Sequence, residues 1–246
     1  MKIYNGSDYL VKQKNEYNIT KNRFAKISCI LPIISIPILY ISGISLYKNP
    51  DSAYYSIVFL LSLVGTGLFF RNAVTSKLAG IKELHFKKGI SSEEELEKTL
   101  SEFLGDGFSY FKNIQIPGTK HGDIDAVLIG YSGVWVIENK NYSGTHTFYN
   151  GIWKRNNKTI YNNPIKQLRT NWKFVKEYLD SKNIDVPIFY RLYWGGNGNL
   201  QIEENIRNHI WYKNSKEWIR KDILSRFMIN KANIESAKQI FVLLST

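Results

Sequence analysis

The chain has 246 residues, enough for one sizeable domain and a smaller one, and it carries a formal net charge of +12 with a pI of about 9.5. Such a charge favours polyanionic partners, and composition alone does not choose between nucleic acid, anionic lipid and a simple solubility charge. The single cysteine, Cys29, excludes an internal disulfide and a cysteine zinc site.

Two long apolar stretches lie near the start of the chain. The first covers residues 24–47, with one charge near its start, and the second covers residues 54–70 without a charge. A membrane-spanning helix needs about 20 apolar residues, with about 17 as the lower limit. Residues 48–53 between them are short and turn-like. We therefore expect residues 24–70 to form a hairpin of two transmembrane helices, with a pair of buried core helices as the alternative.

Lysine and arginine gather outside both ends of this predicted hairpin. Residues 1–23 hold five, residues 71–90 hold five, and the linker within the hairpin holds only Lys48. The positive-inside rule then predicts two spans with both termini cytoplasmic. We expect the membrane to be a bacterial cell membrane. Residues 1–23 form an N-terminal cytoplasmic segment in this interpretation. Residues 71–90 form a basic juxtamembrane linker that contacts lipids of the inner leaflet.

Residues 91–246 alternate helical and extended patterns. A helix is predicted over residues 91–104, where Leu96, Leu100 and Leu104 recur at helical spacing and Ser91 or Ser92 provides a cap. The alternation that follows indicates the α/β class with a mixed sheet. In chain order we expect an extended piece at 114–117, two strands around a turn at 131–132, a strand at 145–149, a turn at 150–151, a helix at 165–179, a strand at 186–194, a loop at 195–199, a strand at 208–212 and helices at 215–226 and 231–244.

The two strands around residues 131–132 carry charges on otherwise apolar sequence: Asp123, Asp125, Glu138 and Lys140. A two-residue turn pairs the strands so that Asp125 faces Glu138 and Asp123 faces Lys140. Two carboxylates about 5 Å apart repel each other unless a cation bridges them or one binds a proton. The flanking valines and isoleucines favour a covered face over a solvated sheet face with a surface Asp–Lys pair, which is the alternative.

A hard divalent cation suits this pair of carboxylates. Mg²⁺ takes oxygen ligands and completes its shell with carbonyls, waters and substrate phosphate. Asp125 and Glu138 are therefore candidate metal ligands, and Lys140 beside them is placed to orient a water or to stabilise charge on a phosphoryl group. No pair of histidines has a spacing that implies zinc, and we expect structural or surface roles for His85, His121, His146 and His209.

These residues resemble the nuclease-related domain family, NERD, which is grouped with the PD-(D/E)xK nucleases. The resemblance lies in GDIDAVLI at 122–129 and in GVWVIENKNYSG at 133–144. It extends to Glu93, to Trp153-Lys-Arg155 and to NPIKQ at 163–167, and it covers roughly residues 80–195. Residues 91–246 then form a nuclease-like domain, with a restriction-endonuclease-like mixed sheet flanked by helices.

The resemblance also implies roles for single residues. Asp125 and Glu138 would be ligands of Mg²⁺ or Mn²⁺, Lys140 the catalytic lysine, and Glu93 and Gln167 supporting residues of the active site. The family's Gly-Glu reads Ser-Glu here, and two further glutamates adjoin Glu93, so which glutamate faces the site is open. Glu93 has a second interpretation as a charge that favours a helix N-terminus, and Gln167 as an ordinary polar residue of a first helical turn.

The part from 145 to 232 is strongly basic, with sixteen Lys and Arg against seven Asp and Glu. Aromatic residues and arginines interleave there. Phosphate contacts and base stacking use such residues, whereas core aromatics with solvated lysines are the alternative. The residues concerned are Tyr190, Arg191, Tyr193, Trp194, Trp211, Tyr212, Trp218 and Arg220.

The sequence as a whole favours a membrane-anchored, Mg²⁺-dependent nuclease that hydrolyses phosphodiester bonds in DNA on the cytoplasmic side. The complete set of Asp, Glu and Lys in register supports the enzyme. Two alternatives are a non-catalytic module that tethers nucleic acid or a protein to the membrane, and a regulatory membrane protein that senses a cytoplasmic ligand. The expected partners are DNA and inner-leaflet lipids, with a homo-oligomer left open and no small-molecule cofactor.

Overall fold

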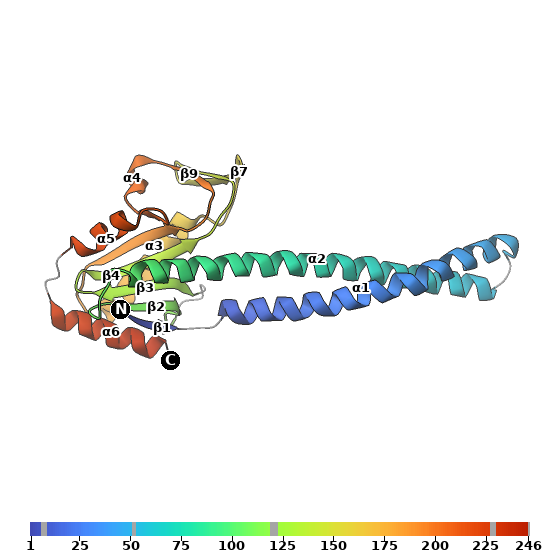
Figure 1. The fold of residues 1–246 in the computed structure, drawn as a ribbon, viewed down its shortest axis with the longest axis horizontal. Coiled ribbons are helices and arrows are strands. Elements are labelled where there is room, and N and C mark those ends of the chain that lie inside the picture. The colour runs from blue at the N-terminus through green and yellow to red at the C-terminus, as the bar shows by residue number, and fades with distance from the viewer. Residues whose placement is uncertain (6–8, 51–52, 119–122, 227–229, 246) are drawn as a thin grey trace. The chain divides into compact units, whose positions relative to one another are not determined.

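Figure 1 shows the computed structural model of the chain, which describes residues 1–5, 9–50, 53–118, 123–226 and 230–245. The side chains of residues 9–11, 13–14 and 26–33 also lie outside the described part. The contacts divide the chain into two units. One combines Met1–Tyr9 with Lys88–Thr246, and the other is Leu10–Lys87. The chain therefore leaves the first unit near residue 9 and returns to it at residue 88.

The unit Leu10–Lys87 consists of two long helices. α1 covers Tyr9–Lys48, and α2 covers Ala53–Ser101 and thus continues into the other unit. Glu83 of α2 forms ion pairs with Lys21 of α1 at 2.6 Å and with Lys87 at 2.8 Å. Hydrogen bonds from these two lysines lower the pKa of Glu83 to about 2. The charged part of the two helices is therefore joined by side-chain contacts.

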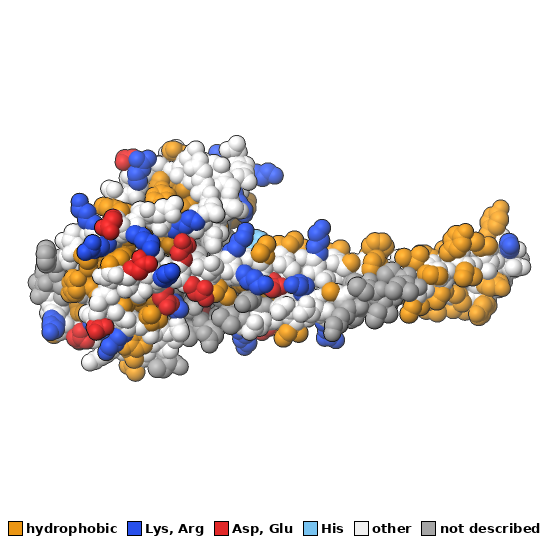
Figure 2. All heavy atoms as spheres, in the orientation of Figure 1, with side chains coloured by type: hydrophobic (Ala, Val, Ile, Leu, Met, Phe, Trp, Pro, Cys, Tyr) orange, Lys and Arg blue, Asp and Glu red, His pale blue; other side chains and the backbone are white. Residues whose placement is uncertain are grey.

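In the apolar part of the two helices, small polar side chains are buried and large hydrophobic side chains are exposed, the reverse of a water-soluble protein. Ser35, Ser42 and Ser62 are buried, whereas many large hydrophobic side chains of the same segments are exposed, as the orange spheres in Figure 2 show. Of the helices in the described residues, α2 is the one that is long and apolar enough to cross a membrane. The part of α1 that follows its undescribed side chains, Ile34–Lys48, is apolar but shorter. The predicted two-span hairpin is therefore not confirmed and stays a prediction.

α2 extends far beyond the second apolar stretch. Residues 71–90, predicted as a linker, and residues 91–101, predicted to begin a separate helix, both belong to it. The prediction that Ser91 or Ser92 caps a helix is wrong, because no proline interrupts this segment and the helix already runs through both serines. Leu96 and Leu100 are fully buried, as their spacing predicted.

The main sheet has six strands in the order β1-β2-β3-β4-β8-β10. β1, β8 and β10 run parallel to the neighbours they pair with, and β2, β3 and β4 are antiparallel to one another. The sheet is thus mixed, which confirms the predicted α/β class with a mixed sheet. Its strands are β1 Lys2–Asn5, β2 Ser109–Ile114, β3 Ile124–Gly130, β4 Gly133–Lys140, β8 Ile188–Trp194 and β10 Ile210–Tyr212.

One edge of this sheet comes from the start of the chain. β1, dark blue in Figure 1, pairs with β2, with Lys2 beside Ser109 and Asn5 beside Lys112. This strand was not predicted, since residues 1–23 were expected to form a separate segment and so short a run carries no clear alternation. The N-terminus therefore belongs to the same sheet as the acidic hairpin.

Helices cover both faces of the main sheet. α3 and α6 lie over one face, where they share a hydrophobic cluster with Val127 and Val136. The end of α2 and α5 lie over the other, where they share a cluster with Leu128 and Trp135. Strands β3 and β4 are thus buried on both faces, which explains their nearly continuous apolar sequence. The helices after α2 are α3 Pro164–Ser181, α4 Glu204–Arg207, α5 Lys216–Leu224 and α6 Lys231–Leu244.

A second sheet has four short strands in the order β7-β6-β5-β9. The predicted turn at 150–151 joins β5 to β6, and both its residues have positive φ, 50° at Asn150 and 75° at Gly151, as the Asn-Gly sequence favours. The loop before β9 lies against the backbone after β4, where a Cβ on Gly196 would come within 2.1 Å of the carbonyl oxygen of Tyr142. The strands are β5 Thr145–Tyr149, β6 Ile152–Arg155, β7 Lys158–Thr159 and β9 Asn199–Ile202.

The predicted helix at 165–179, the strands at 145–149, 186–194 and 208–212, and the two C-terminal helices are confirmed as α3, β5, β8, β10, α5 and α6. The elements that the sequence pattern did not predict are short, namely β1, β6, β7, β9 and α4. β2, Ser109–Ile114, shares only residue 114 with the extended piece predicted at 114–117, so that prediction is displaced. Short elements give few positions from which a period can be read.

Candidate active site

β3 and β4 form the hairpin that carries the acidic residues. Gly130 pairs with Gly133 and Ala126 with Ile137, so the predicted register is confirmed. The paired residues end there, one step before Asp125 and Glu138. The two carboxylates therefore lie just beyond the ladder, where the strands need no longer stay paired.

Tertiary contacts hold the Tyr131–Ser132 turn of this hairpin. Trp135 Nε1 donates a hydrogen bond to Ser132 Oγ at 3.0 Å. The ring of Tyr131 lies edge-on to that of Phe108, with 4.6 Å between the ring centres. Gly133, directly after the turn, has a φ of 119°, and a Cβ there would lie 2.5 Å from the carbonyl oxygen of Pro187. These contacts and this glycine stabilise a turn whose own two residues are not the favoured ones.

Three charged side chains meet where the two strands end. Lys140 Nζ donates a hydrogen bond to Glu138 Oε1 and lies 3.8 Å from Asp125 Oδ2. Asp125 Oδ2 also accepts the backbone N–H of Asn139 at 2.7 Å. The ammonium group thus lies between the two carboxylates. The structure pairs Lys140 with Asp125 and Glu138, whereas the sequence analysis had placed Asp123 opposite the lysine.

Glu138 is the most deeply buried of the three, with none of its surface exposed. Its second oxygen, Oε2, accepts a hydrogen bond at 3.0 Å from Nδ2 of Asn171, a buried residue of α3. Both carboxylate oxygens therefore have donors, which fixes the orientation of the group. Asn171 was not among the residues predicted for the site. Its signal was its place one helical turn after Gln167, on the same helix face.

Gln167 itself is exposed. It lines a pocket of about 340 Å³ together with Asp123 and Asn171. The structure therefore brings Gln167 to the entrance of the site, while Asn171 supplies the contact from α3 to the buried carboxylate.

Glu93 approaches the site from α2. It is half-buried, whereas Glu94 and Glu95 are exposed, so the structure selects Glu93 among the three glutamates. Burial, and next the charge of Asp125, raises the pKa of Glu93 to about 7. The interpretation of Glu93 as a helix N-terminal charge is wrong, because α2 begins at Ala53.

Asn139 fixes the end of β4 against α2. Its Oδ1 accepts a hydrogen bond from Ser92 Oγ at 2.7 Å, while its N–H is the group that binds Asp125. The loop after β8 closes over this contact, since a Cβ on Gly195 would lie 2.0 Å from Ser92 Oγ. The residue between Glu138 and Lys140 is thus held on both sides.

The charges of the site oppose one another. Burial, and next the charge of Asp125, raises the pKa of Glu138 above its usual range. Burial acts in the opposite direction on Lys140, but the charges of Asp125 and Glu138 raise the pKa of the lysine overall. Lys140 therefore stays protonated beside carboxylates that repel each other, and a bound divalent cation relieves such repulsion.

The donors at the site fit a hard divalent cation by their chemistry. Asp125, Glu138 and Glu93 offer carboxylate oxygens, which Mg²⁺ prefers. Within the described ranges, however, no three His, Cys, Asp or Glu side chains are grouped closely enough to form a metal site on their own. An ion here would therefore rely on the two strand carboxylates, with waters or a phosphate as its other ligands.

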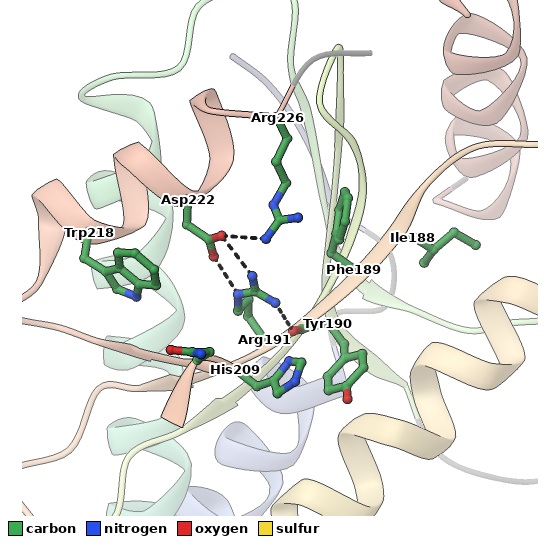
Figure 3. Close-up of a pocket in the computed structure, with 9 residues that line it drawn as sticks. Ile188, Phe189, Tyr190, Arg191, His209, Trp218, Asp222 and Arg226 are labelled. Atoms are coloured by element: carbon green, nitrogen blue, oxygen red, sulfur yellow. Dashed lines mark hydrogen bonds and ion pairs between the residues drawn. The ribbon is translucent and has the colours of Figure 1, made fainter. Parts of the chain in front are cut away.

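A second charged cluster lies on the other face of the sheet, in a pocket of about 420 Å³ that Figure 3 shows in close-up. Asp222 of α5 accepts hydrogen bonds from Nε and Nη2 of Arg191 at 2.6 and 2.9 Å, and from Trp211 Nε1 at 2.9 Å. Arg226 adds a fourth bond at 3.2 Å. Burial opposes the effect, but Arg191 lowers the pKa of Asp222 below its usual value. Both oxygens of Asp222 have donors, while Nε of Arg226 and Nδ1 of His209 are buried without a partner among the described residues. The hydrogen-bonded Asp222–Arg191 pair fits a structural role.

The aromatic residues near this cluster are mostly core residues. Tyr193, Trp194 and Trp211 are buried, which favours the core interpretation for them, and Trp218 is partly exposed. His146 is also buried and accepts a hydrogen bond from Trp153 Nε1 at 3.1 Å, in agreement with a structural role. The predicted residue His121 lies outside the described residues.

Comparison with known families gives one match. The family model of the Nuclease-related domain, NERD, matches residues 88–195. No curated protein and no solved structure matches the chain. The family match begins at the residue where the chain returns to the first unit, and it contains Glu93, Asp125, Glu138, Lys140, Gln167 and Asn171. It supports the nuclease-related family for this part of the chain and a nuclease-like fold.

Proposed function

We propose that this protein is a membrane-anchored, metal-dependent nuclease that hydrolyses phosphodiester bonds in DNA on the cytoplasmic side, with a restriction-endonuclease-like catalytic domain. The observation that carries the proposal is the meeting of Asp125, Glu138 and Lys140 within the region that matches the nuclease-related family. A structural role alone would not require two repelling carboxylates at the end of a buried hairpin.

Each residue has a distinct part in this proposal. Asp125 and Glu138 hold a Mg²⁺ or Mn²⁺ ion, and Asn171 keeps the Glu138 carboxylate in its orientation. When bound, such an ion polarises the scissile phosphate and lowers the pKa of a bound water. Lys140, which stays protonated, stabilises the negative charge that grows on the phosphoryl group. Glu93 places a further carboxylate beside Asp125.

The helix pair supports the membrane part of the proposal. Large exposed hydrophobic side chains and buried serines suit a lipid environment, where small polar residues favour close helix packing. Ser62 and Thr66 also satisfy their hydroxyls within α2, on the carbonyl oxygens of Val58 and Ser62 at 2.8 Å. α1 has 40 residues and α2 has 49. At about 1.5 Å per residue, both are longer than the hydrocarbon core of about 30 Å.

The connectivity supports the number of spans. Residues 1–9 and 88–246 belong to one folded unit. If the segment between them enters a membrane, it must return to the same side, so it crosses an even number of times. Two crossings, through 24–47 and 54–70, agree with this and with the positive-inside pattern. We therefore propose that both termini lie on the cytoplasmic side, close to inner-leaflet lipids.

One observation favours a second function. No complete three-residue metal site is present among the described side chains, and the ammonium of Lys140 already compensates the carboxylates. A non-catalytic module that tethers nucleic acid or a protein to the membrane would need no more than this. The enzyme is the better supported of the two, because a tether gives no reason for the buried Glu138–Lys140 pair.

Cleavage of DNA by the purified full chain in detergent tests the proposal. The full chain is needed because β1 comes from residues 2–5 and would be lost from a fragment that starts after the membrane segment. We expect cleavage of plasmid or linear DNA with Mg²⁺ or Mn²⁺ and loss of cleavage, by at least about a hundredfold, in Glu138→Ala and Lys140→Ala.

Lys216→Ala is the matched control for Lys140→Ala. Lys216 forms an exposed ion pair with Glu102 at 2.8 Å, away from the site, so its removal should leave cleavage unchanged. DNA binding without cleavage under any metal condition would contradict the enzyme and support the tether.

A further inference from the structure

Two pockets meet at the loop between β7 and α3. One, of about 340 Å³, reaches Asn171, whose amide contacts Glu138. The other, of about 440 Å³, is lined by Tyr142 and Arg155. Tyr161 and its neighbour in the chain line both pockets. Tyr161 thus lies at the boundary of both pockets, and the first of them reaches the candidate active site through Asn171. We refer to the two pockets together as the hollow.

Tyr161 is almost completely exposed, at 99%. Its backbone is nevertheless held, because its carbonyl oxygen accepts the N–H of Asn163 at 2.9 Å, and Asn163 is the N-cap of α3. The Nδ2 of Asn163 also donates to the carbonyl oxygen of Gly151 at 3.1 Å. A fixed backbone thus presents a free aromatic ring to solvent beside the site, which is the arrangement of a stacking platform.

Two cations, Arg155 and Lys166, each line one of the two pockets that Tyr161 lines. Arg155 of β6 and Lys158 of β7 are direct cross-strand partners, a pairing of like charges that weakens a hairpin. Lys154 lies on the same hairpin, and Lys166 lines the pocket on the α3 side. In the part of the chain that the structure describes, no ion pair engages these four side chains. A polyanion in the hollow would relieve their repulsion.

We propose that this hollow binds a single strand of the DNA substrate, with an unpaired base stacked on Tyr161 and phosphates at Arg155 and Lys166. A paired base is covered on both faces by its neighbours in the duplex and takes an aromatic ring only after unstacking. The inference rests on the proposed nuclease function and narrows its substrate to single-stranded DNA or to unpaired ends and gaps.

Binding by the full chain in detergent, with EDTA to remove divalent ions, tests the inference apart from cleavage. Fluorescence anisotropy with a labelled single strand and with the blunt duplex of the same sequence gives both affinities. We expect Tyr161→Ala to weaken single-strand binding about tenfold to a hundredfold and to leave duplex binding nearly unchanged, while Tyr161→Phe keeps the wild-type affinity. Arg155→Gln should reduce the slope of log affinity against log salt by about 0.7.

Tyr149→Ala is the matched control, since Tyr149 is exposed on the same small sheet but lines neither pocket. Unchanged single-strand binding in Tyr161→Ala, or an equal loss with the duplex, would overturn the inference. Metal-dependent cleavage together with that result would leave the nuclease proposal standing. Tyr161-dependent binding without any cleavage would reject the nuclease proposal and keep the binding site.

Discussion

The two buried charge clusters of the main sheet differ in how their charges are compensated. On one face, Asp222 accepts four hydrogen bonds, two of them from Arg191, and its pKa is lowered. On the other face, Glu138 shares one lysine with Asp125, and its pKa is raised. The charged form of the carboxylate is stabilised in the first cluster and destabilised in the second.

The difference separates a structural ion pair from a candidate site. The Arg191 side chain is in contact range of two indole rings, at 5.0 Å from the ring centre of Trp135 and 5.9 Å from that of Trp211. Both oxygens of Asp222 accept hydrogen bonds from cationic or indole donors, so its negative charge is compensated. The Glu138 cluster retains carboxylate repulsion that a cation would remove. The pocket beside Asp222 is therefore a weaker indicator of function than the mutual repulsion of Asp125 and Glu138.

Asp222→Ala should have the largest effect on stability, because it leaves Arg191 buried and unpaired. We expect the free energy of unfolding to fall by about 3–5 kcal/mol, measured by denaturation of the full chain in detergent, while the folded fraction still cleaves DNA. Lys216→Ala, an exposed ion pair, should cost at most about 1 kcal/mol.

The Asp222 cluster should make the free energy of unfolding depend on pH in the acid range. A carboxyl whose folded-state pKa is lowered contributes stability above its unfolded pKa, and this stability is lost as the pH falls through the folded value. We expect the wild-type chain to lose stability below about pH 4 and Asp222→Asn to lack this part of the loss. An equal acid dependence in both proteins would show that the Asp222 cluster is not the structural one.

Divalent ions should stabilise the folded chain through the Asp125–Glu138 cluster and not through the Asp222 cluster. At tenfold excess over its dissociation constant, Mg²⁺ should raise the free energy of unfolding by about 1.4 kcal/mol. Asp125→Asn should lose this response, because it removes half of the carboxylate pair, whereas Asp222→Asn should keep it. Thermal unfolding with and without Mg²⁺ measures the effect without any assay of cleavage. A Mg²⁺ response that survives in Asp125→Asn would place the ion elsewhere.

Asn171→Ala should have a smaller effect, on cleavage. Comparing it with Gln167→Ala distinguishes the roles of these two residues of α3. Loss of the hydrogen bond to Glu138 Oε2 should lower cleavage about tenfold or more. Gln167→Ala, one turn earlier and exposed, should change cleavage less. The ratio of kcat/KM between each variant and the wild type measures both. A larger loss in Gln167→Ala would favour the role that the family resemblance implied over the geometry of the free site.

The sequence by itself determined the acidic hairpin. A two-residue turn at 131–132 was enough to predict the register of β3 and β4, because the length of the turn fixes which residues face each other across the hairpin. It also determined the α/β class and the long helices and strands after residue 164, whose periods extend over many positions.

The tertiary structure decided which groups complete the site. Asn171 and Glu93 reach the hairpin from helices far away in sequence, and a single strand's pattern holds no information about them. The continuity of α2 through Ser91 and the pairing of β1 with β2 were likewise decided by packing. A local cap signal and the propensity of a four-residue strand contribute less free energy than tertiary packing. The same packing made Asp125, rather than Asp123, the partner of Lys140, because contact distances follow from the folded backbone and not from spacing alone.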